Sequence, residues 1–350
     1  MKNEQIIKRR LERHKDFWKK TNNSPLIGYS FGNYFVSKRF NAVDNLLGME
    51  RCVRADDFNV ESFLHDYDSM YEQSIEEGAD LVFSACPFTG LPWMESMFGC
   101  KVIPKENSFI ASPVLGADFG KEIKIVDYSW SEKYYEFIDF INKNGEGRYP
   151  AAQPILRGPG DVLAGIFGPE ELIFCFYDYP EHAKLRLNEI SDVFLNFIKK
   201  NLEKSKDFFG GYSMGFYPIW CPGKALWFQD DITALLSPEL YDEFFLSIHQ
   251  RMANAYEYSM IHLHPGSFYL IDRLLAIDTL KAIQINKDIG GPSVSEMLPV
   301  LLNVQSKKNL VLWGDFTDDD IKLLTNGLNA EGLFIIVHSD YKRNRLKSIE

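Results

Sequence analysis

The sequence predicts an α/β protein that folds as a single (β/α)8 TIM barrel, and two observations lead to this prediction. Short apolar runs alternate with longer amphipathic stretches from residue 26 to the end, which is typical of strand–helix units around a parallel sheet. There are eight such runs, the number of strands in this barrel. No low-complexity tract or Ser/Gly-rich linker divides the 350 residues. We therefore expect one barrel over residues 26–350, preceded by a helical extension over residues 1–25.

The expected strands are runs of four or five residues that are rich in apolar side chains. In chain order they cover 26–30, 80–84, 153–156, 225–229, 260–263, 281–285, 310–313 and 333–337.

Amphipathic stretches between these runs predict helices. The clearest helix start is Ser237 followed by Pro238, because serine is a preferred N-cap and proline suits the first helical position. The expected helices cover 131–143, 180–204, 237–258 and 293–305, and residues 1–20 predict a further helix ahead of the first strand.

Composition and charge exclude several classes of protein. The chain carries 38 Lys and Arg against 49 Asp and Glu, a formal charge of −11, which repels nucleic acid and anionic membrane surfaces. The apolar runs are far shorter than the ~20 residues that cross a bilayer, and the charged N-terminal stretch is unlike a signal peptide. Five scattered cysteines without a CxxC pair indicate reduced thiols and exclude a zinc ribbon. We therefore expect a cytoplasmic protein with no nucleic-acid or membrane partner.

Catalytic residues of such barrels lie in the loops that follow the strands, so the candidate site residues are sought there. The polar residues at these points are Cys86 and Glu95 after the second expected strand, Arg157 and Asp161 after the third, Asp230 and Asp231 after the fourth, His262 and His264 at the fifth, Asp288 after the sixth, Asp315 after the seventh and His338 after the eighth.

The histidines at the fifth strand suggest a metal site. His262 and His264 are two residues apart, so on a strand their side chains point to the same face, as two ligands of one metal would. Two hydrogen-bonded histidines at a strand end are an alternative of equal weight on this spacing alone. His338 can complete a three-histidine set with a fourth position open to water or substrate, the arrangement of catalytic zinc sites. The remaining histidines lie in charged helical patterns and are expected at the surface: His14, His65, His182 and His249.

Two acidic residues are candidate catalytic groups. Successive side chains of an extended segment face opposite ways, so one of Asp230 and Asp231 is expected to point inward, and we favour Asp231. A helix cap or a solvated loop carboxylate is an equal alternative for Asp231. For Glu95, a solvent-facing acid at a helix start has the same weight as a role in a pocket.

Several segments together resemble the uroporphyrinogen decarboxylase superfamily. They are QPILRGPGDVLAGIFGPEELIFCFYDYPE at 153–181, ALWFQDDITALLSPELYDEFF at 225–245, and IHLHPGS followed by QINKDIGGPS. The likeness covers nearly the whole chain, and the combination of a G-P turn after the third strand, a DD-x5-SPE-x-Y helix start and an H-x-[CH] fifth strand is much more specific than any one of these motifs. The resemblance independently implies a single (β/α)8 barrel.

The chain departs from the true decarboxylases of this superfamily. Their arginine motif after the first strand corresponds to GYSFGNYFV here, the aspartate after the second strand to Ala85, and the tyrosine after the third to Gly165. Without cations, a bound polycarboxylate tetrapyrrole would carry the cost of unpaired buried charges. These departures from the decarboxylases it resembles therefore imply that uroporphyrinogen is not the substrate.

The zinc-dependent methyltransferases of the superfamily, which pass methyl groups between corrinoid proteins and thiols, are more similar. Their ligands, an H-x-C pair and a distant cysteine, correspond to His262, His264 and His338, so the resemblance implies zinc although both cysteines are replaced. Three imidazoles would leave a +2 centre, a stronger Lewis acid than a neutral His-Cys-Cys site. No D-x-H-x-x-G motif occurs, so a corrinoid would arrive on a separate protein.

The expected function is metal-dependent methyl transfer. We assign His262, His264 and His338 as metal ligands, Asp231 and Glu95 as catalytic groups, and Arg157 and Asp315 as substrate-binding residues. The expected partners are a small-molecule substrate, a corrinoid protein and, for assembly, a second copy of the chain as a homodimer. Two alternatives stay open: a lyase that clamps a carboxylated substrate with Arg157, and a noncatalytic tetrapyrrole or corrinoid binder.

Overall fold

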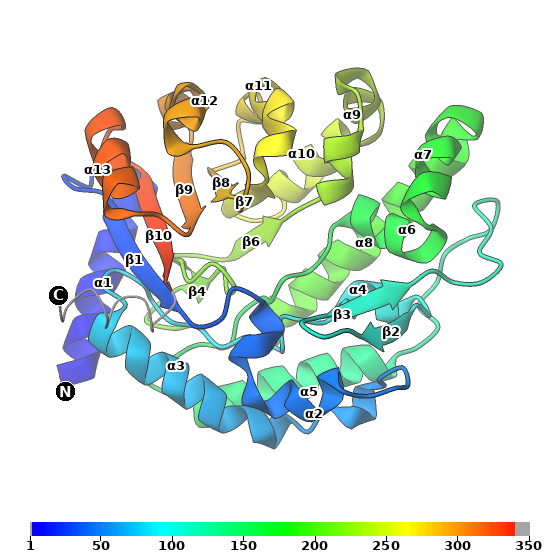
Figure 1. Ribbon diagram of the computed structural model, residues 1–350, viewed down its shortest axis with the longest axis horizontal. Coiled ribbons are helices and arrows are strands. Elements are labelled where there is room, and N and C mark those ends of the chain that lie inside the picture. The colour runs from blue at the N-terminus through cyan, green and yellow to red at the C-terminus, as the bar shows by residue number, and fades with distance from the viewer. Residues whose placement is uncertain (1, 340–350) are drawn as a thin grey trace.

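A six-stranded parallel sheet forms the centre of the molecule in the computed structural model, which describes residues 2–339 (Figure 1). The strand order is β1-β10-β9-β8-β7-β6, and every neighbouring pair is parallel. The strands are β1 (Leu26–Phe31), β6 (Ala225–Phe228), β7 (Tyr258–Leu263), β8 (Ala282–Lys287), β9 (Asn309–Gly314) and β10 (Leu333–Ser339). Six of the eight expected strands are therefore confirmed, and residues 340–350 of the expected barrel lie outside the described part of the chain.

The expected strands at 80–84 and 153–156 are wrong, because neither segment forms a ladder. Isolated β-bridges replace the two expected ladders: one joins Gly28 to Ala79, and another joins Ala85 to Ala151. The Gln153 side chain then donates to the main-chain oxygen of Trp227 on β6 (2.8 Å). These contacts run from β1 to β6 in the order that two further barrel strands would take, but they do not close a hydrogen-bonded barrel.

Proline explains part of this irregularity. Pro150 precedes the second segment and Pro154 lies within it, and proline has no N–H to donate to a ladder. In the first segment, the Asp80 carboxylate accepts from the Ile27 main-chain N–H (2.9 Å), so a side chain replaces a backbone partner at the edge of β1.

Helices cover the outside of the sheet, and Figure 1 shows α11, α12 and α13 following one another beside the strands β8, β9 and β10. The expected helix at 237–258 is two helices that meet at the buried Phe245, and its last residue, Tyr258, begins β7. The long helices are α1 (Lys2–Lys19), α3 (Leu64–Glu77), α5 (Ser129–Asn144), α6 (Pro159–Phe167), α7 (Pro169–Asp178), α8 (Pro180–Lys204), α10 (Leu246–Asn254), α12 (Val294–Lys307) and α13 (Asp318–Gly327). The shorter elements are α2 (Asp44–Leu47), α4 (Trp93–Met97), α9 (Pro238–Phe244), α11 (Ile271–Leu275), the hairpin β2 (Lys101–Pro104) with β3 (Phe109–Ser112), and the pair β4 (Tyr212–Ser213) with β5 (Trp220–Cys221).

Both faces of the sheet are buried, so its strands are continuous apolar runs, as in parallel sheets covered on both sides. Alternate residues enter two different cores. Ile335 and Leu312 belong to the larger cluster under the helices, whereas Phe334 and Val311 belong to a smaller cluster with Trp227. Among residues 2–339, no helix is long and apolar enough to cross a membrane.

Candidate functional site

Three of the candidate residues meet at the carboxyl ends of β6 and β7. His262 lies near the end of β7, His264 follows that strand, and Asp231 opens a 3-10 helix, η5 (Asp231–Leu235), just after β6. The two strands are paired, with Phe228 opposite Ile261, which brings these ends together. In the described part of the chain, one ligand atom from each of the three side chains lies within 4.8 Å of the others.

The ring of His262 is fixed by its neighbours inside the sheet. Its Nδ1 lies 2.8 Å from the Tyr217 hydroxyl and donates to Oε1 of Gln284, the residue directly opposite on β8. The Gln284 amide nitrogen donates to Asn286 (3.0 Å), which leaves Oε1 as the atom that faces the ring. A proton on Nδ1 leaves the Nε2 lone pair free, and Nε2 lies 4.0 Å from Oδ1 of Asp231.

The ring of His264 is held by a carboxylate. Its Nδ1 lies 2.8 and 2.9 Å from the two carboxylate oxygens of Asp288, which follows β8. This hydrogen bond raises the pKa of His264, whereas burial lowers the pKa of His262 and favours its neutral form. Both rings therefore use Nδ1 for a protein partner and keep Nε2 for another ligand.

The donor set of this group fits a catalytic zinc ion. Two histidines and one carboxylate, with a fourth position open, form one of the known catalytic zinc arrangements. A carboxylate behind one of the histidines is a frequent supporting feature of such sites. Zinc ligands lie about 2.0–2.2 Å from the ion and hence roughly 3.4 Å from each other, so the side chains need to close by at most ~1.4 Å. Asp231, which is 47% exposed, has room for this movement.

The structure does not bring His338 into this group. Its ring stacks on Trp313 with centroids 5.3 Å apart, and its Nδ1 lies 3.3 Å from Nη2 of Arg39. His338 is distant because two strands, β9 and β8, separate β10 from β7. The third member of the group is therefore Asp231 and not the third histidine that we expected.

The neighbouring Asp230 is not part of the group with His262 and His264, and its contacts join two loops. Its buried carboxylate accepts from the main-chain N–H groups of Gly160 (2.6 Å) and Asp161 (3.2 Å) and lies 3.0 Å from Nε2 of His249. In the opposite direction, the Asp161 carboxylate accepts from the main-chain N–H groups of Asp231 (2.9 Å) and Ile232 (2.8 Å). Burial raises the pKa of both Asp161 and Asp230.

The expected surface position of two histidines is wrong. His249 is 1% exposed and supports Asp230, and His14 is 0% exposed in the contact between α1 and the rest of the protein. Charged neighbours in the sequence conceal that each ring lies on the inward face of its helix.

Glu95 and Arg157 form an ion pair, and Arg157 lies beside Asp231 in the same cleft. Oε1 of Glu95 lies 3.0 Å from Nη1 of Arg157, and Glu95 is completely buried rather than facing water. Burial raises the pKa of Glu95, while the carboxylate raises the pKa of Arg157. A Cβ at Gly165 would lie 2.7 Å from Cγ of Glu95, so a larger residue at that position would collide with this acid.

Arg157 also lines an open cleft of about 550 Å³, together with Asp161 and Asp231. Asp315 does not line this cleft. It is exposed after β9, and its main-chain oxygen accepts from Lys287 (2.8 Å).

Sequence reasoning missed three residues that belong to the site or its surroundings. Tyr217 and Gln284 hold His262: Gln284 lies opposite it in the register of β7 and β8, and Tyr217 reaches it from the segment between β4 and β5. Arg39 lies just beyond the segment in which an arginine motif was sought, and it reaches the same end of the sheet.

Comparisons with known proteins support the fold alone. No protein-family model matches this chain, and no curated protein matches it. Among solved structures, a methyltransferase from Methanosarcina mazei matches with a TM-score of 0.65 and 12% sequence identity, covering 95% of this chain and 93% of that one. At this identity the likeness extends to the overall fold, and the activity has to be argued from the site.

Proposed function

We propose that this protein is a zinc-dependent methyltransferase whose metal is held by Asp231, His262 and His264. The observation that carries the proposal is the convergence of these three ligand atoms within 4.8 Å, with both histidine rings held through Nδ1. Two facts support methyl transfer over other zinc chemistry: the fold is shared with a protein described as a methyltransferase, and the motifs resemble the uroporphyrinogen decarboxylase superfamily.

Zinc at this position would supply a Lewis acid that lowers the pKa of a bound thiol or water. Two neutral imidazoles and one carboxylate give a formal +1 centre, between the +2 of three histidines and the neutral His-Cys-Cys site. Asp288 keeps the His264 ring in one orientation, and Gln284 does the same for His262. The open fourth position would take the methyl acceptor, with the donor, such as a corrinoid on a separate protein, approaching from the carboxyl ends of the strands.

Metal analysis of the purified protein tests the ligand set. We expect about one zinc per chain in the wild type and its loss in His264→Ala and Asp231→Ala. His338→Ala should keep the metal, as should His182→Ala, a control at an exposed histidine. Loss of zinc in His338→Ala would instead support His262, His264 and His338 as the metal ligands. A wild-type protein that holds no transition metal near neutral pH would contradict the proposal.

A lyase is the second candidate, because Arg157 is 43% exposed and lines the cleft beside Asp231. Its charge is already compensated by Glu95, which weakens its hold on a substrate carboxylate. Release of carbon dioxide from a carboxylated substrate, abolished in Arg157→Ala, would favour this alternative. Uptake of cobalamin without turnover of any methyl donor would instead favour a noncatalytic binder.

A further inference from the structure

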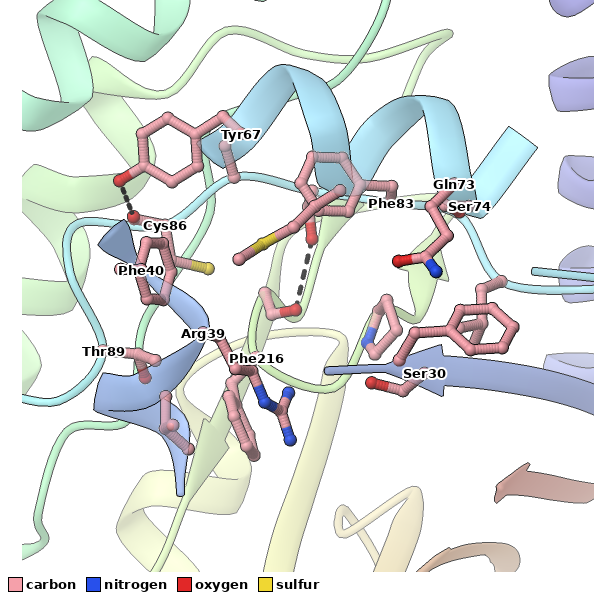
Figure 2. A pocket seen from close by; sticks show the side chains of 18 of the residues that line it. Ser30, Arg39, Phe40, Tyr67, Gln73, Ser74, Phe83, Cys86, Thr89 and Phe216 are labelled. Atoms are coloured by element: carbon pink, nitrogen blue, oxygen red, sulfur yellow. Dashed lines mark hydrogen bonds between the residues drawn. The ribbon is translucent and has the colours of Figure 1, made fainter. Parts of the chain in front are cut away.

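A second pocket, of about 120 Å³, lies beside β1, apart from the residues of the proposed metal site (Figure 2). It is lined by α3, the end of β1, the segment around residues 83–89, and Phe216. Most of its wall is apolar or aromatic, including Phe40, Tyr67 and Phe83. No acidic residue is among the described side chains that line it.

Arg39 is the cation of this wall, and it lacks a compensating carboxylate. It ends the short 3-10 helix η1 (Val36–Arg39). Its Nε donates to the main-chain oxygen of Asn33 (2.7 Å), and its Nη2 lies 3.3 Å from Nδ1 of His338. Within residues 2–339 it pairs with no Asp or Glu. Loss of hydration lowers the pKa of Arg39 to about 10, so the guanidinium stays charged at neutral pH.

Three further polar groups in the wall have no partner among the described residues. Ser74 is buried, and its hydroxyl makes no hydrogen bond. The Ser30 hydroxyl and the Gln73 amide are half-buried and likewise make none within residues 2–339. Figure 2 shows the Gln73 amide pointing from α3 toward the side of the pocket that carries Ser30. Buried polar groups are normally satisfied, so the Ser74 hydroxyl in the wall of a cavity is available to a ligand, and the half-buried Ser30 and Gln73 are available beside it.

We propose that this pocket binds a small apolar molecule with one carboxylate, which pairs with Arg39 while Ser30, Gln73 and Ser74 offer hydrogen bonds. An arginine fork matches a carboxylate in two-point contact, and the apolar wall matches a hydrocarbon body. A cavity of about 150 Å³ is known to hold benzene, so a pocket of about 120 Å³ limits the ligand to a compact acid whose hydrocarbon part is no larger than one benzene ring.

The pocket is close to the proposed metal site but does not depend on it. Phe216 lines the pocket, and the next residue, Tyr217, contacts His262. Ser30 near the end of β1 and His262 near the end of β7 lie at the same end of a parallel sheet. A bound carboxylate would therefore occupy the same end of the protein as the metal, and its binding can be measured with or without zinc.

Isothermal titration calorimetry with benzoate tests the proposal, with benzamide as a neutral probe of the same shape. We expect one saturable benzoate site per chain and at least tenfold weaker binding of benzamide. Arg39→Met should weaken benzoate binding at least tenfold and remove the preference over benzamide. Met70→Trp, which fills the pocket from α3, should weaken both probes.

Lys38→Met is the matched control, because Lys38 is an exposed cation next to Arg39 and does not line the pocket. It should bind benzoate like the wild type, and circular dichroism should show that every variant is folded. Absence of saturable benzoate binding, equal binding of benzamide, or an unaffected Arg39→Met variant would each overturn the proposal. His264→Ala should also bind benzoate normally, so a failed zinc site and a failed carboxylate site give different results.

Discussion

The two histidines of the proposed zinc site are each held in place by hydrogen bonds at Nδ1. Asp288 and Gln284 each contact an Nδ1 and thereby leave Nε2 directed to a ligand. Such supporting contacts typically change metal affinity 10–100-fold when removed. The proposal therefore predicts effects of residues that would not touch the metal.

Asp288→Asn is expected to lower the affinity for zinc about 10–100-fold, because an amide is a weaker acceptor for Nδ1–H and no longer favours a basic Nε2. Competition with a chromogenic chelator measures this change. Asp319→Asn, at a 92% exposed carboxylate, should leave the affinity unchanged. Equal affinities for all three proteins would mean that Asp288 does not support a metal ligand.

Residue types and spacing were sufficient to find two of the three ligands of the proposed site. The period of two on a strand places His262 and His264 on one face, as the ring centroids 4.7 Å apart confirm. The sequence indicates Asp231 as a catalytic candidate. Assigning it, and not His338, as the third metal ligand requires knowing that β6 pairs with β7. Tertiary pairing of this kind is not encoded in local spacing.

At the scale of elements, six strands could be predicted because buried parallel strands are continuous apolar runs. The other two apolar runs look alike in sequence, yet side-chain contacts of Asp80 and Gln153 replace their ladders. The loops after 153–156 and β6 are joined by buried acids rather than by sheet pairing. Adjacent aspartates thus have separate roles, one in joining loops and one in the proposed metal site.

Asp230→Asn should destabilise the protein by about 2–4 kcal/mol, because its carboxylate is buried and accepts three hydrogen bonds. Asp231→Asn, at a half-exposed residue, should cost less than about 1 kcal/mol but remove zinc. Urea unfolding of the metal-free proteins and metal analysis of the same samples measure both effects. If Asp231→Asn were the more destabilising change, the assignment of the two roles would be reversed.

Helix α1 docks through a neutral histidine, which makes its attachment sensitive to acid. Nδ1 of His14 accepts from the Trp220 N–H (3.0 Å), and Nε2 donates to the Asp80 main-chain oxygen (2.8 Å). Burial lowers the pKa of His14 to about 4. Below pH 6.5 His14 becomes protonated in the unfolded chain but stays neutral in the folded protein. The free energy of unfolding therefore falls as the pH drops from about 6.5 to 4.

The loss attributable to His14 should reach about 3 kcal/mol at pH 4, since each pKa unit corresponds to ~1.36 kcal/mol. Urea unfolding of the wild type and of His14→Gln over this pH range measures it. The variant should be less stable near pH 7 but should lose less on acidification. Parallel pH profiles for the two proteins would show that His14 does not carry this effect.

At the scale of the whole molecule, the proposed metal site is a small addition to a large apolar core. Its ligands come from β7 and from the loops after β6 and β7, whereas the core extends from α1 to β10. The fold should therefore persist without metal, unlike small zinc domains that unfold when the ion is removed. Binding still stabilises the folded state by mass action.

Zinc at 100 times its dissociation constant adds about 2.7 kcal/mol of stability. With an unfolding entropy of roughly 2.1 cal/mol/K per residue, a chain of 350 residues should gain about 3–4 °C in Tm. Calorimetry of the wild type before and after chelation, and after zinc is restored, should show this reversible shift, and His264→Ala should show none. Unfolding on chelation would mean that the ion is structural, and an equal shift in His264→Ala would place the zinc elsewhere.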